Sequence, residues 1–363
     1  RGLKRVITSD TADVRLMLAA LFFLFSLGGA VFGMGEEVIP FVLMLVPVLT
    51  RLGYDRVTVI LVTLAATQVG FAASWMNPFS VAIAQGIADL PLLSGMQLRI
   101  FMWAVFTVFG MAFTVVYAGR NRVEPVMESA ENVSQQETLG KGDLLVLLFL
   151  ALTVGWIIWG VISAGYYLPE IATQFLVLGI ACGFAGAIFG LNGMTANSAA
   201  EAFRQGAMAM VPAALIIGFA RGIVYLMGGD DPTEPSLLNS LLYFGSESLG
   251  GLPAWLAAWF MLAGQSIFNF FVTSGSGQAA LTMPIMAPLS DLIGVTRQVA
   301  VLAFQLGDGL TNIVVPTSAV LMGCLGAARL DWLEWVRAIA WFFAGLIGLA
   351  SLFVIGASLA GFS

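Results

Sequence analysis

The chain has 363 residues, of which 59% are hydrophobic and only 10% are charged, and its mean hydropathy is +0.95. Soluble domains carry about 25% charged residues, so this composition excludes a soluble protein and predicts an all-α polytopic membrane protein. The net charge of −6 comes mostly from acids in loops, and there is no His to serve as a metal ligand or proton relay. We therefore expect the lipid bilayer as a partner, with no nucleic-acid partner, no metal site and no cofactor.

The apolar segments, in chain order, are 16–32, 38–50, 57–88, 98–119, 144–165, 171–190, 207–227, 253–272, 279–293, 298–327 and 336–360. Segments 38–50 and 279–293 are too short to cross a bilayer, which takes about 20 residues. Each follows a longer segment through a Gly-rich break, which predicts a re-entrant hairpin. Segments 57–88 and 298–327 are too long for one straight helix, and their Gly, Asn and Pro residues predict two broken helices inside the membrane.

A motif at residues 33–56 returns at residues 275–297, so that Arg56 pairs with Arg297. Residues 77–86 then pair with residues 315–323. Three further pairs share one constant offset: Arg99 with Arg337, Trp103 with Trp341, and Gly110 with Gly348. Internal repeats with apolar segments interrupted at matching places are typical of secondary transporters.

When the chain is threaded across the membrane through these segments, most of the 15 Lys and Arg residues lie on one side. Only Arg99, Arg221 and Arg297 fall toward the other side. The positive-inside rule makes the basic face cytoplasmic. Arg56 is then inside and Arg297 outside, so we expect the repeats to be inverted in a multi-pass protein of the inner (cytoplasmic) membrane.

These patterns predict four regions of the chain. The first inverted repeat is expected at 1–119, a polar cytoplasmic linker at 120–143, scaffold helices with an amphipathic connector at 144–252, and the second inverted repeat at 253–363. Because the chain begins at Arg1, we also expect the natural protein to carry further residues ahead of it.

Polar residues gather at the two hairpin tips and the two helix breaks. A charge at the centre of a membrane helix costs about 2.5–3.5 kcal/mol and usually marks function, and helix ends expose N–H and C=O groups that attract ions. Gly33, Gly35, Gly275 and Gly277 are expected to allow turns with positive φ. The candidate substrate- or ion-binding residues are Gly35, Glu36, Glu37, Asn77, Pro78, Ser80, Asn269, Ser274, Gly275, Ser276, Gly277, Gln278, Asp308, Thr311, Asn312, Pro316, Thr317 and Ser318.

Other interpretations of these residues stay open. Glu36 and Glu37 could cap a half-helix through its dipole, Asp308 could pair with a nearby dipole, and Arg221 could be structural. Thr311 and Asn312 could tie helices together by hydrogen bonds. An ion channel would need a continuous polar stripe, and an enzyme would need a nucleophile with a base, neither of which the pattern offers.

At residues 33–41, 71–86, 214–223 and 269–323 the chain resembles the YfcC-type branch of the C4-dicarboxylate anaerobic carrier (DcuC-like) family, in the ion transporter superfamily. The resemblance covers essentially the whole chain. It implies an elevator-type carrier with a scaffold domain and a transport domain, a homodimer, and extra helices ahead of residue 1. Substrate binding is implied at residues 33–37, 74–80, 273–278 and 311–318, although the Ser-Asn-Thr triplet of related carriers is absent here.

The expected function is a secondary active transporter, either an antiporter or a symporter coupled to Na⁺ or H⁺. Two adjacent glutamates at the first tip suit an amino-bearing substrate better than a dianion, which they would repel. A small amino acid, above all a basic one, is therefore the favoured substrate. A C4-dicarboxylate carrier is the alternative, and an ion channel is the alternative from another class.

Overall fold

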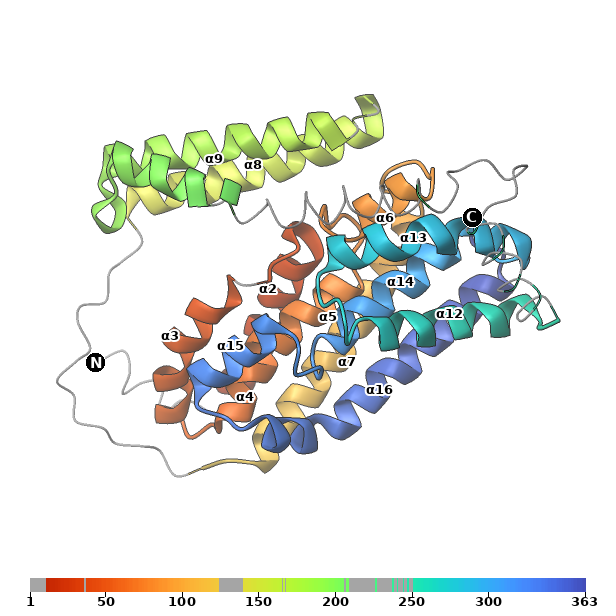
Figure 1. Ribbon diagram of the computed structural model, residues 1–363. Coiled ribbons are helices and arrows are strands. Elements are labelled where there is room, and N and C mark those ends of the chain that lie inside the picture. Colours follow the sequence, from red (N-terminus) through yellow and green to blue (C-terminus); the bar gives the residue numbers. More distant parts are fainter. Residues whose placement is uncertain are drawn as a thin grey trace. The chain divides into compact units, whose positions relative to one another are not determined.

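The computed structural model describes residues 11–35, 37–123, 140–164, 166, 168–205, 207–208, 226, 237, 240, 244, 247 and 251–363. In these ranges the protein is helical, with one isolated β-bridge between Tyr54 and Arg122 and no strand (Figure 1). The contacts divide the chain into two compact units. The first consists of Arg1–Met127 with Phe219–Ser363, and the second of Glu128–Gly218.

The first half of the larger unit contains two helices joined by a short non-helical segment, then an interrupted helix and a long helix. Asp55 caps the interrupted helix by accepting from the Thr58 amide at 2.9 Å. A π-helical turn widens this helix midway, and it stops at Ala72, before the segment that contains Pro78. The elements are α2 (Thr11–Phe32), α3 (Val38–Arg51), α4 (Arg56–Ile60), η1 (Leu61–Ala65), α5 (Ala66–Ala72), α6 (Val81–Ile87) and α7 (Met96–Arg120).

The second half repeats this order of elements. Ser274, Thr296 and Ser318 each cap a helix, with the side chain accepting from the amide three residues on. Because Ser274 caps it, α13 begins at Gly275, four residues before the expected start at residue 279, and it has 18 residues. The elements are α12 (Ala254–Phe268), α13 (Gly275–Leu292), α14 (Arg297–Thr311), α15 (Ala319–Ala328) and α16 (Trp332–Leu359).

The two halves exchange contacts with one another. Helix α3 packs against α15 of the other half, and α13 packs against α6 (Figure 1). Arg56 donates to the carbonyl of Arg329 at 2.8 Å, and its repeat partner Arg297 donates to the carbonyl of Ala88 at 2.9 Å. Arg329 and Ala88 are the C-caps of α15 and α6, where helix carbonyls lack partners and a cation is favourable.

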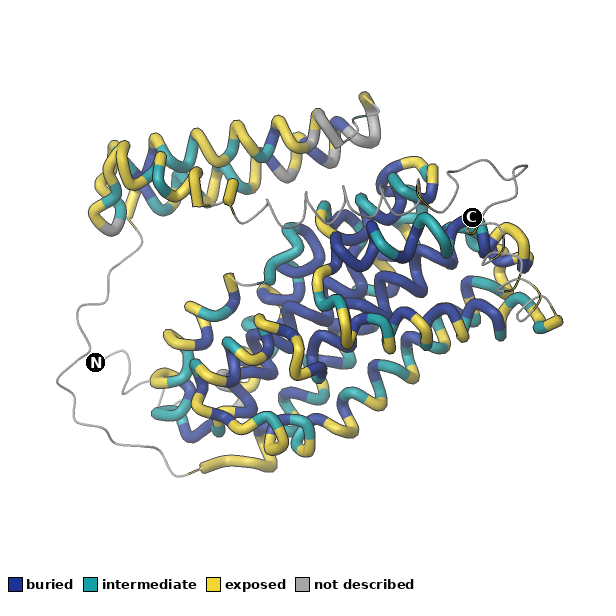
Figure 2. Tube along the Cα trace, viewed as in Figure 1, coloured by how far each residue is buried: buried dark blue, intermediate teal, exposed yellow. Residues whose placement is uncertain are grey.

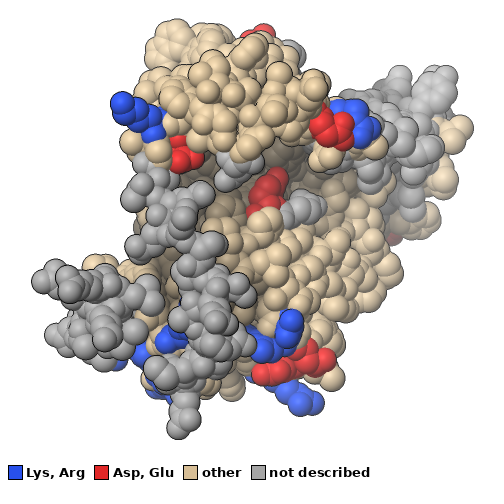
Figure 3. All heavy atoms as spheres, turned by 90° about the vertical axis from the view of Figure 1, so that its left-hand side faces the viewer, with Lys and Arg blue, Asp and Glu red and all other residues tan. Residues whose placement is uncertain are grey.

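The interrupted helices form the core of the larger unit, as the dark tubes of α5 and α14 in Figure 2 show. Every residue of α5 and every residue of α14 after Arg297 is buried. By contrast, α7 and α16 expose apolar side chains such as Val108 and Trp341. On the face shown in Figure 3, most of the described surface carries no charged side chain. Among the described residues, four stretches are long and apolar enough to span a membrane: Arg15–Phe32, Met96–Arg120, Ala172–Phe189 and Trp332–Leu359.

The smaller unit contains α8 (Lys141–Ala164) packed against α9 (Leu168–Phe189), which confirms the helices expected at 144–165 and 171–190. After the short turn η3 (Leu191–Gly193), an exposed helix covers residues 196–205, within the predicted amphipathic connector. Arg204 and Glu201 form an ion pair on this helix at 2.6 Å. Almost all of the expected segment 207–227, including Arg221, lies outside the described residues, and the predicted domain boundaries stay predictions.

Candidate functional site

The second hairpin tip lies against the break between α14 and α15. Asn269, just after α12, donates to the Thr311 hydroxyl at 2.7 Å and to Asn312 Oδ1 at 3.1 Å. Asn312 in turn donates to Asp308 Oδ1 at 3.4 Å, one helical turn earlier on α14. All four side chains are buried, so a polar cluster joins the end of α12 to the end of α14.

This cluster contains acceptor atoms without a partner. Asp308 is fully buried, its Oδ2 accepts no hydrogen bond, and the Oδ1 atom of Asn269 is also unpaired. A Cβ atom added to Gly275 would lie 2.9 Å from Asp308 Oδ2, so the free carboxylate oxygen faces the start of α13. Carboxylate and amide oxygens are suitable ligands for a hard cation, and a carboxylate also binds a proton.

The first tip lies against the break between α5 and α6 in a similar way. Ser74 donates to the carbonyl of Ala30 at 2.6 Å and accepts from the Asn77 amide at 2.7 Å, which fixes the start of the break. A Cβ atom on Gly33 would lie 2.3 Å from Asn77 Oδ1, so the tip touches this side chain. The Nδ2 atom of Asn77 and the hydroxyl of Ser80 are buried without partners.

The two breaks meet where α5 and α14 end. A Cβ atom on Gly309 would lie 2.6 Å from the Cα of Ala72, and one on Gly275 would lie 2.9 Å from the ring of Phe71. Gln305 donates from α14 to the carbonyl of Ser74 at 2.6 Å. The residues predicted at the first break therefore form one cluster and those at the second tip form another. Both clusters adjoin the crossing of α5 and α14.

A buried arginine next to this crossing was not among the predicted site residues. Arg99 of α7 is fully buried, donates to the side-chain oxygens of Gln305 and Gln298, and leaves its Nε unpaired. With Asp308, it is one of two charged residues with buried side chains in the described part of the chain. The sequence contains one sign of a polar contact on α14: Gln298 and Gln305 are seven residues apart and therefore share one face of the helix.

Several predicted residues lie elsewhere. Glu37 is exposed at the N-cap of α3, but its side chain makes no capping hydrogen bond and accepts instead from the Gly35 amide ahead of the helix at 2.9 Å. Glu36 lies outside the described residues. Pro316 and Thr317 are exposed, and Thr317 donates to the Phe270 carbonyl at 2.8 Å.

The remaining predicted residues of the second half stabilise the hairpin and the helix ends. Gln278 is buried but donates to Gln265 of α12, at 2.9 Å to the carbonyl and 2.7 Å to Oε1. Ser276 lies 3.4 Å from the capping Ser274, hydroxyl to hydroxyl, and Ser318 caps α15.

The expectation of positive φ at four tip glycines was wrong at three of them. Gly33 has φ of +66°, whereas Gly35 has no positive φ, and Gly275 and Gly277 belong to the first turn of α13. At Gly275 the missing side chain instead allows close approach of Asp308 and Phe71.

The two glycines of the first tip offer a matched test. We expect Gly33→Ala to impair transport strongly, because its Cβ would overlap Asn77 and the positive φ costs roughly 1–2 kcal/mol for an L-residue. Gly35→Ala has no neighbour within 4 Å and is the control. Initial uptake rates at matched amounts of folded protein check this result. Equal loss of uptake in both variants would contradict the contact of the tip with Asn77.

Two interrupted helices that cross inside an apolar helical unit, each facing a hairpin tip, are features of membrane carriers. The C4-dicarboxylate anaerobic carrier family matches residues 1–359 of this chain. The chain therefore belongs to the C4-dicarboxylate anaerobic carrier family, and it is a multi-pass membrane transporter.

The chain is also similar to individual proteins. The chain is 48% identical to an Escherichia coli K12 protein described as "Putative basic amino acid antiporter YfcC", over 99% of this chain and 73% of that protein. It is 27% identical to an uncharacterised Haemophilus influenzae protein, over 98% of this chain and 70% of that protein. The fold is similar to the crystal structure of the Alcanivorax borkumensis YdaH transporter, with a TM-score of 0.70 and 18% identity over 97% of this chain and 82% of that one.

Proposed function

We propose that this protein is a secondary active transporter, an antiporter or ion-coupled symporter, that moves a basic amino acid across the cytoplasmic membrane. The proposal rests on the crossing of the two interrupted helices at Ala72 and Gly309, with unpaired polar atoms in the clusters on both sides. A buried polar group without a partner is costly, so a polar substrate or ion that supplies the missing partners binds favourably there.

The charges around the crossing favour a substrate with amino groups. Asp308 is a buried carboxylate without an ion pair, and Glu37 lies at the first tip. The described residues of the tips and breaks include no Lys or Arg, so a dicarboxylate would find no direct counter-charge among them. The name of the Escherichia coli relative agrees with a basic amino acid. The C4-dicarboxylate alternative follows from the family name.

The exchange of contacts between the halves supports the proposal of inverted repeats. Arg56 of the first half contacts the end of α15 in the second half. Its repeat partner Arg297, of the second half, contacts the end of α6 in the first half. Such a pseudo-two-fold relation is expected if two repeats of opposite orientation surround one site. We propose that the re-entrant hairpins and broken helices move together as the transport domain of a homodimer, and that 144–252 contributes to the scaffold.

Asp308 is our proposed coupling residue. Its unpaired Oδ2 and the unpaired Oδ1 of Asn269 suit Na⁺, and the carboxylate alone suits H⁺. A bound cation would neutralise the buried charge and supply the partner that these oxygens lack.

The experiment is uptake into proteoliposomes loaded with unlabelled substrate, with labelled lysine, arginine or succinate outside. We expect saturable uptake of lysine or arginine that responds to an imposed Na⁺ or pH gradient. Saturable uptake of succinate alone would replace the proposal with the dicarboxylate alternative. Flux that does not saturate would indicate a channel.

A further inference from the structure

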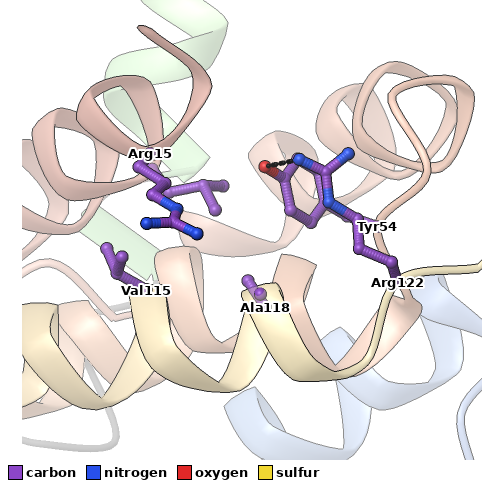
Figure 4. Close-up of a pocket in the computed structure, with 7 residues that line it drawn as sticks. Arg15, Tyr54, Val115, Ala118 and Arg122 are labelled. Atoms are coloured by element: carbon purple, nitrogen blue, oxygen red, sulfur yellow. Dashed lines mark hydrogen bonds between the residues drawn. The ribbon is translucent and has the colours of Figure 1, made fainter. Parts of the chain in front are cut away.

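A cavity of about 260 Å³ lies beside the ends of two helices that are long enough to span the membrane. Its walls come from α2, from α7 and the residues just after it, and from the turn before α4, all in the larger unit. Figure 4 shows Arg15 on one side of this cavity and Arg122 with Tyr54 on the other. The lining residues are Arg15, Leu18, Tyr54, Val115, Ala118, Gly119 and Arg122.

Both arginines lack an acidic partner among the described residues. The Arg122 guanidinium lies 4.3 Å from the centre of the Tyr54 ring and donates to the Tyr54 hydroxyl at 2.9 Å. Burial raises the pKa of the Tyr54 phenol, and the charges of Arg122 and Arg15 both oppose that rise, as two cations near one hydroxyl should. The nearby Asp55 is already used by Thr58 and Tyr117.

The rest of the cavity wall is aliphatic and lies next to surface that suits lipid. Leu16, beside Arg15, is 71% exposed, and Val116, beside Val115, is 52% exposed. Arg15 and Arg122 also fall on the face that the positive-inside rule makes cytoplasmic, where anionic lipids give the membrane a negative surface potential. A soluble anion would use the arginines alone, whereas a lipid would use the arginines and the apolar wall.

We propose that this cavity binds the phosphate headgroup of an anionic phospholipid. Arg15 and Arg122 hold the phosphate oxygens from two sides, as guanidinium groups commonly do. Leu18, Val115 and Ala118 contact the adjoining glycerol and the start of an acyl chain.

The test measures phospholipid binding to the purified full-length protein by native mass spectrometry and by the shift in melting temperature. Phosphatidylglycerol is compared with phosphatidylcholine and with inorganic phosphate. The double variant Arg15→Gln/Arg122→Gln removes the site. The control Arg51→Gln/Arg120→Gln removes two arginines from the last turns of α3 and α7 that do not line the cavity.

We expect phosphatidylglycerol to stabilise the wild type and the control. It should bind the Arg15→Gln/Arg122→Gln variant roughly tenfold more weakly than it binds the wild type. Gly119→Leu tests the site with both arginines retained. Its Cβ meets no atom within 4 Å and its side chain should fill the cavity, so we expect the same loss of binding.

Three results would overturn the proposal. Equal binding of phosphatidylglycerol by the cavity variant and the wild type would place lipid binding elsewhere. An equal response to phosphatidylcholine would remove the role of headgroup charge. A response to inorganic phosphate as large as that to phosphatidylglycerol would indicate a site for soluble anions.

Discussion

Replacing Asp308 with Asn is expected to reduce coupled uptake by roughly 10- to 150-fold. A hydrogen bond to a charged group contributes about 1.5–3 kcal/mol, and the loss of one such contact corresponds to this change in rate. The Asn side chain keeps the size of Asp308 and can still accept from Asn312, so the helix crossing should be preserved. Removing an unpaired buried charge should leave the melting temperature unchanged or raise it. A loss of uptake without a loss of stability would therefore assign Asp308 to transport.

The measurement is the initial uptake rate in proteoliposomes at several Na⁺ concentrations and several pH gradients. Glu334→Gln, which also removes one carboxylate but on an exposed face of α16, is the control. If Asp308 binds the coupling ion, Asp308→Asn should lose its response to that ion while exchange of substrate persists. Wild-type uptake with an unchanged ion dependence in Asp308→Asn would refute its coupling role.

Replacing Arg99 with Ala is expected to destabilise the protein by about 2–6 kcal/mol. The change leaves the side-chain oxygens of Gln298 and Gln305 without their donor, and each orphaned buried acceptor costs about 1–3 kcal/mol. Loss of the Arg99 side chain should also loosen the packing of α7 against α14 and the break at Ser74, because Gln305 of α14 contacts both Arg99 and the Ser74 carbonyl. Transport should fall together with stability.

The thermal unfolding midpoint in detergent measures this effect. Arg337→Ala is the matched control, because Arg337 is the repeat partner of Arg99 but is exposed and should cost little. A double variant, Arg99→Leu/Gln298→Leu, should recover part of the lost stability, because it removes one of the two orphaned acceptors while Ser94, to which Gln298 donates, keeps its contact with Gln85. A melting temperature of Arg99→Ala equal to that of the control would show that the network contributes no stability.

The order of helices and their interruptions could be predicted well from the sequence, since both depend on local signals. Apolar length, Gly and Pro positions and the repeat located the short helix at residues 38–50 and the broken segments at 57–88 and 298–327. The starts of helices were less accurate: Ser274 caps α13, and a polar Gly-Ser stretch gave no apolar signal for its first turn.

The site was only partly predictable, because its contacts join residues far apart in the chain. Asn269, Asp308, Thr311 and Asn312 were predicted to gather, and they form one hydrogen-bonded cluster. Gln278 was assigned to the site because it follows the tip, but its side chain turns toward α12. Arg99 entered the sequence analysis only through its repeat pairing and its side of the membrane. The spacing of Gln298 and Gln305 shows that they share a helix face, but it does not show that this face meets Arg99.

The packing of α3 against α15 has a consequence for biogenesis. Helix α3 ends at Arg51, and its partner begins only at Ala319, so the ribosome must add most of the chain before the two can meet. At ordinary translation rates this delay is on the order of 10–50 seconds. The newly inserted α3 must therefore wait in the bilayer, shielded by lipid, by the insertion machinery or by its own neighbours, until α15 has been synthesised.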